Sequence, residues 1–219
     1  MTRAVEPERA GDVKRRARAL LPALAHGARL GLFGGSFDPA HDGHLAVADA
    51  ARRACRLDGL LWLVTPRSPL KPGQAYAPLA ARLAEARRLA RGRAWLHVSA
   101  FEAEVGTRFT ADTISAVVAR RPDLRLVWVM GADSLAGFHR WRDWRGIADA
   151  VPMLVVSRPG HALSALCGPA ARALAGARRP ARHAASLPGA APPAWVYLPG
   201  ISVPISSTGL RALRSQASS

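Results

Sequence analysis

Short apolar runs alternate along this chain with longer segments of helical composition, and this alternation limits the possible folds. The runs carry few polar residues, as in strands buried on both faces of a sheet. The predicted strands span residues 28–33, 60–64, 95–99, 124–130, 153–157 and 194–198. The predicted helices span residues 44–57, 79–91, 110–120, part of 135–150, and 208–215. The pattern predicts an α/β fold with a doubly wound parallel sheet. Such sheets bind ligands beyond the carboxyl ends of their strands.

The length of 219 residues is typical of one domain with a short appendage. We assign residues 1–27 to an N-terminal extension and residues 28–219 to the domain. Residues 13–25 are arginine-rich and then apolar, which predicts a short helix or a mobile extension. A signal peptide would need a longer apolar core, and the acids of this segment argue against a mitochondrial-type transit peptide. Residues 159–193 are weakly patterned.

The charge balance is strongly basic, with 31 Lys+Arg against 15 Asp+Glu and a net charge of +16. This excess of positive charge suggests an anionic partner, and the candidates are nucleic acid, a membrane surface and a phosphate-rich small molecule. Compositional bias is the alternative, because arginine outnumbers lysine 29 to 2. The hydrophobic content of 49% excludes a disordered basic tail. Cys55 and Cys167 show no metal or disulfide spacing, so we expect a reducing compartment, the cytoplasm.

The first predicted strand leads directly into the loop G-G-S-F-D-P-A-H-D-G-H-L, residues 34–45. Gly34 and Gly35 permit a tight turn and a close approach of ligand to backbone. His41 and His44 are three apart at the start of a predicted helix, where N–H groups and the helix dipole favour phosphate. Helix capping is the structural alternative. A zinc pair lacks a third ligand of the usual kind, so we predict no protein metal site.

The last predicted strand leads to I-S-S-T-G-L-R, residues 205–211. Its hydroxyls precede a predicted helix, so they are candidate N-caps and phosphate donors. Arg211 stands one turn after Thr208 and can return its guanidinium toward the same anion. An ordinary helix cap remains the alternative.

The middle of the chain adds further candidates. Lys71 is one of only two lysines, which hints at a need for a compact charge after the second strand. Asp133 follows Gly131 at a strand end, where an acid can accept from ribose hydroxyls. Thr110 stands where it would cap the predicted helix 110–120. Trp141 is either core or a plate for a flat heterocycle.

Together these segments resemble the H-x-G-H nucleotidyltransferase superfamily, and within it the nicotinate-nucleotide adenylyltransferases. The loops at 34–45 and 205–211 match two signature motifs of that family in the right order, and the likeness covers roughly residues 28–215. The segments R-F-T-A-D-T, G-A-D-S-L and S-R-P-G also match. Leu70, Arg108 and Arg142 depart from the family pattern, in which histidine, a small or polar residue, and tyrosine are common.

The resemblance implies a Rossmann-like nucleotidyltransferase that transfers the adenylyl group of ATP to nicotinate mononucleotide, with Mg²⁺ accompanying ATP. It implies that His41, His44, Lys71 and Arg211 act on the phosphates. The implied ATP-binding residues are Gly34, Gly35, Ser36, Phe37, Arg158, Ile205, Ser206, Ser207 and Thr208. The implied acceptor-binding residues are Thr110, Gly131, Asp133, Trp141 and Arg142.

Small-molecule substrates, without specific nucleic acid or membrane, are the expected partners, and the oligomeric state stays open. Alternatives are the same chemistry on nicotinamide mononucleotide or phosphopantetheine, and a non-catalytic module that binds nucleotides or nucleic acid. If the substrates are small molecules, most arginines reflect the arginine-rich composition of the surface and do not bind a partner.

Overall fold

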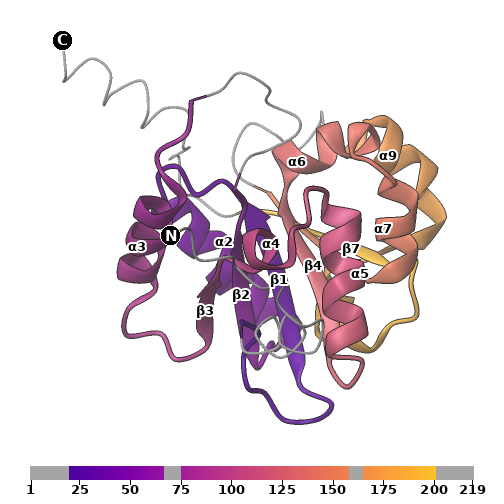
Figure 1. The fold of residues 1–219 in the computed structure, drawn as a ribbon. Coiled ribbons are helices and arrows are strands. Elements are labelled where there is room, and N and C mark those ends of the chain that lie inside the picture. The colour runs from indigo at the N-terminus through magenta and orange to yellow at the C-terminus, as the bar shows by residue number, and fades with distance from the viewer. Residues whose placement is uncertain (1–19, 67–74, 158–164, 201–219) are drawn as a thin grey trace, which may run out of the picture.

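The computed structural model describes residues 20–66, 75–157 and 165–200. In this part of the chain a single parallel sheet has the strand order β3-β2-β1-β4-β5-β7-β6 (Figure 1). The strands are β1 (Arg29–Gly35), β2 (Gly59–Val64), β3 (Leu96–Ser99), β4 (Arg125–Gly131), β5 (Met153–Val156), β6 (Arg178–Arg179) and β7 (Trp195–Leu198). All of their pairings are parallel. The predicted doubly wound parallel sheet is confirmed.

The helices follow the strands in the expected alternation. They are α2 (Asp42–Cys55), α3 (Leu79–Ala90), α4 (Phe101–Val105), α5 (Thr110–Arg120), α6 (Ala132–Gly137), α7 (Trp144–Ala150) and α9 (Pro169–Ala173). Short 3₁₀ helices are η1 (Phe138–Arg140), η2 (Ala175–Ala177) and η3 (Ala181–Gly189). None of the helices within the described ranges is long and apolar enough to cross a membrane.

The predicted strands agree with the observed ones to within one or two residues at each end. The predicted helical part of 135–150 divides into α6, η1 and α7, and the predicted helix 208–215 lies outside the described residues. The weakly patterned stretch contains α9, η2, β6 and η3, which we did not predict. Strand β6 is two arginines that pair only with β7, too short for any periodicity to show.

Each face of the sheet is covered by its own set of helices. Leu30 and Leu32 of β1 belong to a buried cluster with residues of α4, α5, α6, α7 and α9. Phe33 of the same strand faces the opposite cluster, which contains residues of α2, α3 and η3. Since successive side chains of a strand point to opposite faces, both faces must be apolar. This is why the strands read as continuous apolar runs.

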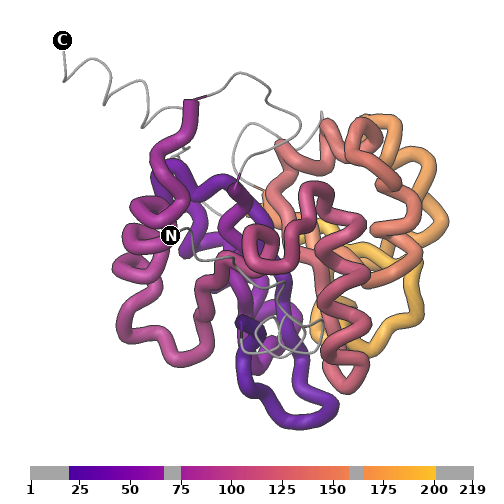
Figure 2. Tube along the Cα trace, in the orientation of Figure 1, coloured from indigo at the N-terminus to yellow at the C-terminus, as the bar shows by residue number. Residues whose placement is uncertain are grey.

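Strand β1 occupies the point where the direction of chain winding reverses. From β1 the chain adds β2 and then β3 on one side, and it returns to add β4 on the other side (Figure 2). The loops that leave β1 and β4 therefore diverge at the carboxyl ends of neighbouring strands. Open α/β sheets bind ligands in the crevice that such a reversal creates.

The chain before β1 is tied to the domain by Arg121. Its guanidinium donates to the carbonyls of Pro22 and Leu24 at 2.7 and 2.8 Å, and it pairs with Asp123 at 2.8 Å. Leu21, in the same segment, is buried in the core. Residues 20–24 thus pack as part of the domain.

Candidate active site

The end of β1, which leads into the first loop, has a close packing contact that only glycine permits. A Cβ at Gly34 would lie 2.7 Å from Cη2 of Trp128, which is buried on neighbouring β4. The next glycine, Gly35, is less constrained, because its Cβ would lie 3.3 Å from the ring of Phe37. The backbone at the end of β1 therefore lies directly against the side chain of Trp128 on β4.

His41 and His44 cap the start of α2 through a reciprocal pair of hydrogen bonds. His41 is the N-cap, and its Nδ1 accepts from the backbone N–H of Gly43 at 3.0 Å. The Nδ1 of His44 accepts from the backbone N–H of His41 at 3.2 Å. The two ring centroids are 4.0 Å apart. A neutral imidazole that accepts at Nδ1 carries its proton on Nε2, so this arrangement makes both Nε2 atoms donors.

Phe37 supports the histidine pair from below. Its backbone has a φ of 46°, in the left-handed region, and its side chain is fully buried. The ring lies 4.7 Å from that of His44 and 4.9 Å from that of Trp62. Any contact of Phe37 with a ligand in this arrangement is through its backbone.

The start of α5 lies beside the residues that follow η1. The guanidinium of Arg142 stacks 4.5 Å above the ring of Phe109 and approaches Asp112 at 3.7 Å. Thr110 is the first residue of α5, and Phe109 is its N-cap without a side-chain hydrogen bond. The structural alternative in which Thr110 caps this helix is therefore wrong, whereas the predicted helix 110–120 coincides with α5. Arg142 is exposed, so the ion pair is a surface contact.

Trp141 connects this region to the centre of the sheet. Its ring packs edge-on against Trp128 at 6.3 Å and Phe138 at 5.4 Å, and it is only partly buried. Gly131 ends β4 and is the N-cap of α6, whose first turn contains the exposed Asp133. Trp128 thus lies between the backbone of Gly34 and the ring of Trp141.

Several predicted site residues lie outside the described residues. They are Lys71, Arg158, Ile205, Ser206, Ser207, Thr208 and Arg211. The described strands that precede them, β2, β5 and β7, are parallel to β1 and end at the same edge of the sheet.

Arg82 was missed by the sequence analysis. It lies on α3 with only 2% of its surface exposed, and its guanidinium donates to the carbonyl of Ser36 in the first loop. It also donates to Thr65 and Pro66, which follow β2. Burial lowers the pKa of this guanidinium, while the nearby charge of Asp38 acts in the opposite direction. In the sequence Arg82 is one arginine among many, and only the fold reveals its burial.

A buried carboxyl, Glu102, adds a second polar link. It is hydrogen-bonded to the side chains of Thr65 and Thr113, and Thr113 in turn contacts Thr107 at 2.9 Å. Glu102 is 7% exposed, and burial raises its pKa despite these hydrogen bonds. The segment after β2 is therefore held from α3 by Arg82 and from α4 by Glu102.

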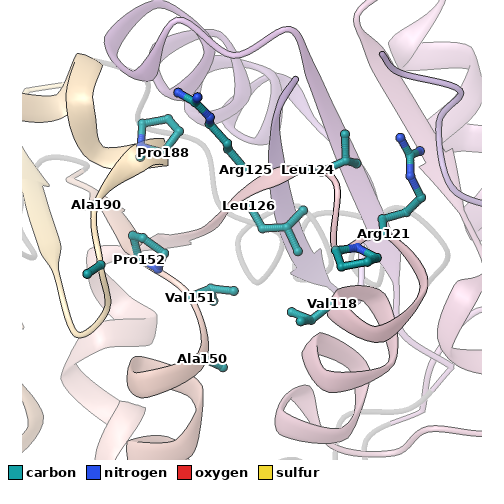
Figure 3. A pocket seen from close by; sticks show the side chains of 13 residues that line it. Val118, Arg121, Leu124, Arg125, Leu126, Ala150, Val151, Pro152, Pro188 and Ala190 are labelled. Atoms are coloured by element: carbon teal, nitrogen blue, oxygen red, sulfur yellow. The ribbon is translucent and has the colours of Figure 1, made fainter. Parts of the chain in front are cut away.

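A hollow at the opposite edge of the sheet is separate from these residues. It is lined by residues that include Val118, Leu126, Val151 and Pro188, with Arg121 and Arg125 beside them (Figure 3). Val118 and Leu126 precede or begin β4, Val151 precedes β5 and Pro188 precedes β7, whereas the first loop follows the carboxyl end of β1. The hollow is thus not part of the candidate site.

Comparison with known proteins agrees with this geometry. The cytidylyltransferase-like family model matches residues 32–213. A probable nicotinate-nucleotide adenylyltransferase from Caulobacter sp. (strain K31) is 50% identical over 188 residues, which is 86% of this chain and 99% of the relative. A protein of the same name from Rhizobium meliloti is 47% identical over 85% of this chain and 98% of its own length. The chain belongs to the nicotinate-nucleotide adenylyltransferase family.

Solved structures show the same fold at low sequence identity. The Plasmodium falciparum nicotinic acid mononucleotide adenylyltransferase complexed with NaAD has a TM-score of 0.63 and 13% identity, and the match covers 84% of this chain and 83% of that one. The same enzyme complexed with APC has a TM-score of 0.62 over the same shares. The fold of this family member is thus the Rossmann-like nucleotidyltransferase fold.

The donors near the first loop do not form a metal cage. Within residues 20–66, 75–157 and 165–200, no three His, Cys, Asp or Glu side chains cluster so as to hold a metal ion.

The buried Glu102 predicts a pH-dependent stability. Its pKa is raised on folding, so the folded state favours the neutral acid and ionisation costs stability. As the pH rises from the unfolded pKa of about 4.3 through the folded value, the wild type should lose stability relative to Glu102→Gln. Urea unfolding of both proteins between about pH 4 and pH 8 measures this difference.

Glu104→Gln, which alters an exposed carboxylate of the same helix, is the control. A difference between wild type and Glu102→Gln that stays constant with pH would contradict the burial argument.

Proposed function

We propose that this chain transfers the adenylyl group of ATP to nicotinate mononucleotide, giving nicotinate adenine dinucleotide and pyrophosphate in NAD biosynthesis. The observation that carries the proposal is the 50% identity to a probable nicotinate-nucleotide adenylyltransferase over 99% of that relative's length. The histidine pair at the carboxyl end of β1 supports it, because two Nε2–H donors at a helix start suit phosphate oxygens.

The reaction needs little from the protein besides position and charge. A 5′-phosphate oxygen of the acceptor attacks the α-phosphorus of ATP, and the bond from that phosphorus to the bridging oxygen breaks as pyrophosphate leaves. The attacking oxygen is already anionic near neutral pH, so no general base is assigned. The rate acceleration comes from aligning the two substrates and from neutralising charge on the triphosphate.

We assign the neutralising role to His41 and His44, together with Lys71 and Arg211. The backbone of Gly34, Gly35, Ser36 and Phe37, with Arg158 and residues 205–208, would hold ATP. Magnesium enters with ATP as part of the substrate, and no step is assigned to it. Because ATP is a cytoplasmic metabolite, we place the reaction in the cytoplasm.

The acceptor side is assigned to the start of α5 and the residues around η1. Trp141 presents a partly buried indole that is fixed by Trp128 and Phe138, as a plate for a flat pyridine ring requires. Arg142 is fixed above Phe109 near Thr110 and offers a charge to the nicotinate carboxylate. Gly131 and Asp133 complete the proposed set.

The direct test is pyrophosphate release from ATP and Mg²⁺ in the presence of single mononucleotides. We expect release with nicotinate mononucleotide and much less with nicotinamide mononucleotide or phosphopantetheine. Equal or greater release with either of the other acceptors would contradict the assigned substrate. Tight, salt-dependent binding of RNA without pyrophosphate release would favour a binding module instead.

Replacement of His44 tests the phosphate role. His44→Ala removes one donor from the site, so kcat should fall by about 10² to 10³ fold. Steady-state pyrophosphate release measures kcat, and circular dichroism verifies the fold, because the His44 ring also packs on Phe37. His183→Ala changes an exposed histidine on η3 and is the control. Near-normal turnover of folded His44→Ala would remove His44 from the mechanism.

Replacement of Trp141 tests the acceptor site. Trp141→Ala should raise the KM for nicotinate mononucleotide about tenfold, since a lost stacking contact is worth 1–3 kcal/mol, and leave the KM for ATP nearly unchanged. Trp144→Ala is the matched control, because Trp144 also packs on Phe138. A rise in the KM for ATP alone would show that Trp141 serves the other substrate.

A further inference from the structure

One buried guanidinium, that of Arg82, contacts three separate segments at the carboxyl edge of the sheet. Its Nη1 donates to the carbonyls of Ser36 and Thr65, both at 2.7 Å. Its Nη2 donates to the carbonyl of Pro66 at 2.8 Å, and its Nε to that of Ala77 at 2.9 Å. Ser36 lies in the first loop, Thr65 and Pro66 follow β2, and Ala77 precedes α3.

These contacts require the shape of arginine. A guanidinium presents five N–H donors in a rigid plane, and the four contacts above draw on all three of its nitrogen atoms. A lysine ammonium has three donors on one atom and cannot reach carbonyls on several sides. Asp38 lies close enough to act on the charge of Arg82, so the charge is not isolated.

The Arg82 contacts connect the first loop, which carries His41 and His44, to the segment that follows β2. Ser36 immediately follows the two glycines, and the carbonyl of Gly35 also accepts from the N–H of Thr65 at 2.9 Å. The first loop is therefore attached to the segment after β2 by two bonds, one of which passes through Arg82. Hydrophobic packing already holds α3, since Leu83 and Ala86 are buried against the sheet. Apolar packing therefore docks α3 on the sheet, and the hydrogen bonds from Arg82 fix the first loop and the segment after β2 relative to that helix.

We propose that Arg82 is a positioning residue for adenylyl transfer, which sets the first loop at a fixed distance from the segment that follows β2. The inference rests on the proposed function, because it concerns the triphosphate side of the same site. Arg82 is buried behind the loop and acts on ATP through the backbone of Gly35, Ser36 and Thr65.

The test compares Arg82→Lys with two controls on the same helix. Arg87→Lys changes an exposed arginine of the last turn. Leu83→Ala removes core packing and so loses stability without touching the carbonyl contacts. Each protein is assayed at a temperature at which circular dichroism shows it to be folded. Calorimetry gives the affinity for an ATP analogue with a non-cleavable α,β-methylene bridge, and pyrophosphate release gives kcat and KM.

For Arg82→Lys we expect kcat/KM for ATP to fall by about 100-fold, as small misplacements of catalytic geometry do, with weaker binding of the analogue. The KM for nicotinate mononucleotide should stay within about twofold. Both controls should keep wild-type affinity for the analogue. Wild-type affinity and kcat in folded Arg82→Lys, or an equal loss of affinity in Leu83→Ala, would overturn the proposal.

If Arg82→Lys does not fold, Arg82→Gln takes its place, and failure of both to fold would show a structural role only and overturn the proposal. The binding measurement also separates the two hypotheses. If the wild type binds the analogue but releases no pyrophosphate with any mononucleotide, the proposed reaction fails, while the affinities of the variants still decide the role of Arg82.

Discussion

The parallel pairing of β1 with β2 on one side and β4 on the other is the constraint on which this structure depends. Since all strands point the same way, every loop that leaves a carboxyl end emerges at one edge of the sheet. The reversal of winding at β1 separates the loops after β1 and β4. The first loop lies at this reversal, and the end of β1 that leads into it lies against Trp128 of β4.

Polar contacts then fix the conformation of the first loop at the carboxyl end of β1. His41 and His44 bind backbone N–H groups through Nδ1, which directs the proton of each neutral ring to Nε2. Phe37 fills the space beneath His44, and Arg82 binds the carbonyl of Ser36 from behind. The cap uses Nδ1 of each ring and the proposed phosphate role uses Nε2, so the capping alternative and the phosphate hypothesis do not compete.

Sequence patterns were most informative where a residue's neighbours in space are also its neighbours in the chain. The strands were placed well because burial on both faces demands continuous apolar runs, and the spacing of His41 and His44 indicated their shared position at a helix start. The helix 110–120 was placed correctly, but the alternative that Thr110 caps it is wrong, because Phe109 is the N-cap. Strand β6 was missed, because two arginines become a strand only when β7 offers an edge.

The sequence by itself determined the alternation of strands and helices, the position of His41 and His44 at a helix start, and the family likeness carried by the loops. Only the tertiary structure decided which arginines are buried and hold separate segments together, because burial and hydrogen-bond partners come from residues distant in the chain. Arg82 binds Ser36, 46 positions away, and Arg121 binds Pro22, 99 positions away. Both look like the arginines of an arginine-rich surface until the fold removes them from water and supplies their carbonyl partners.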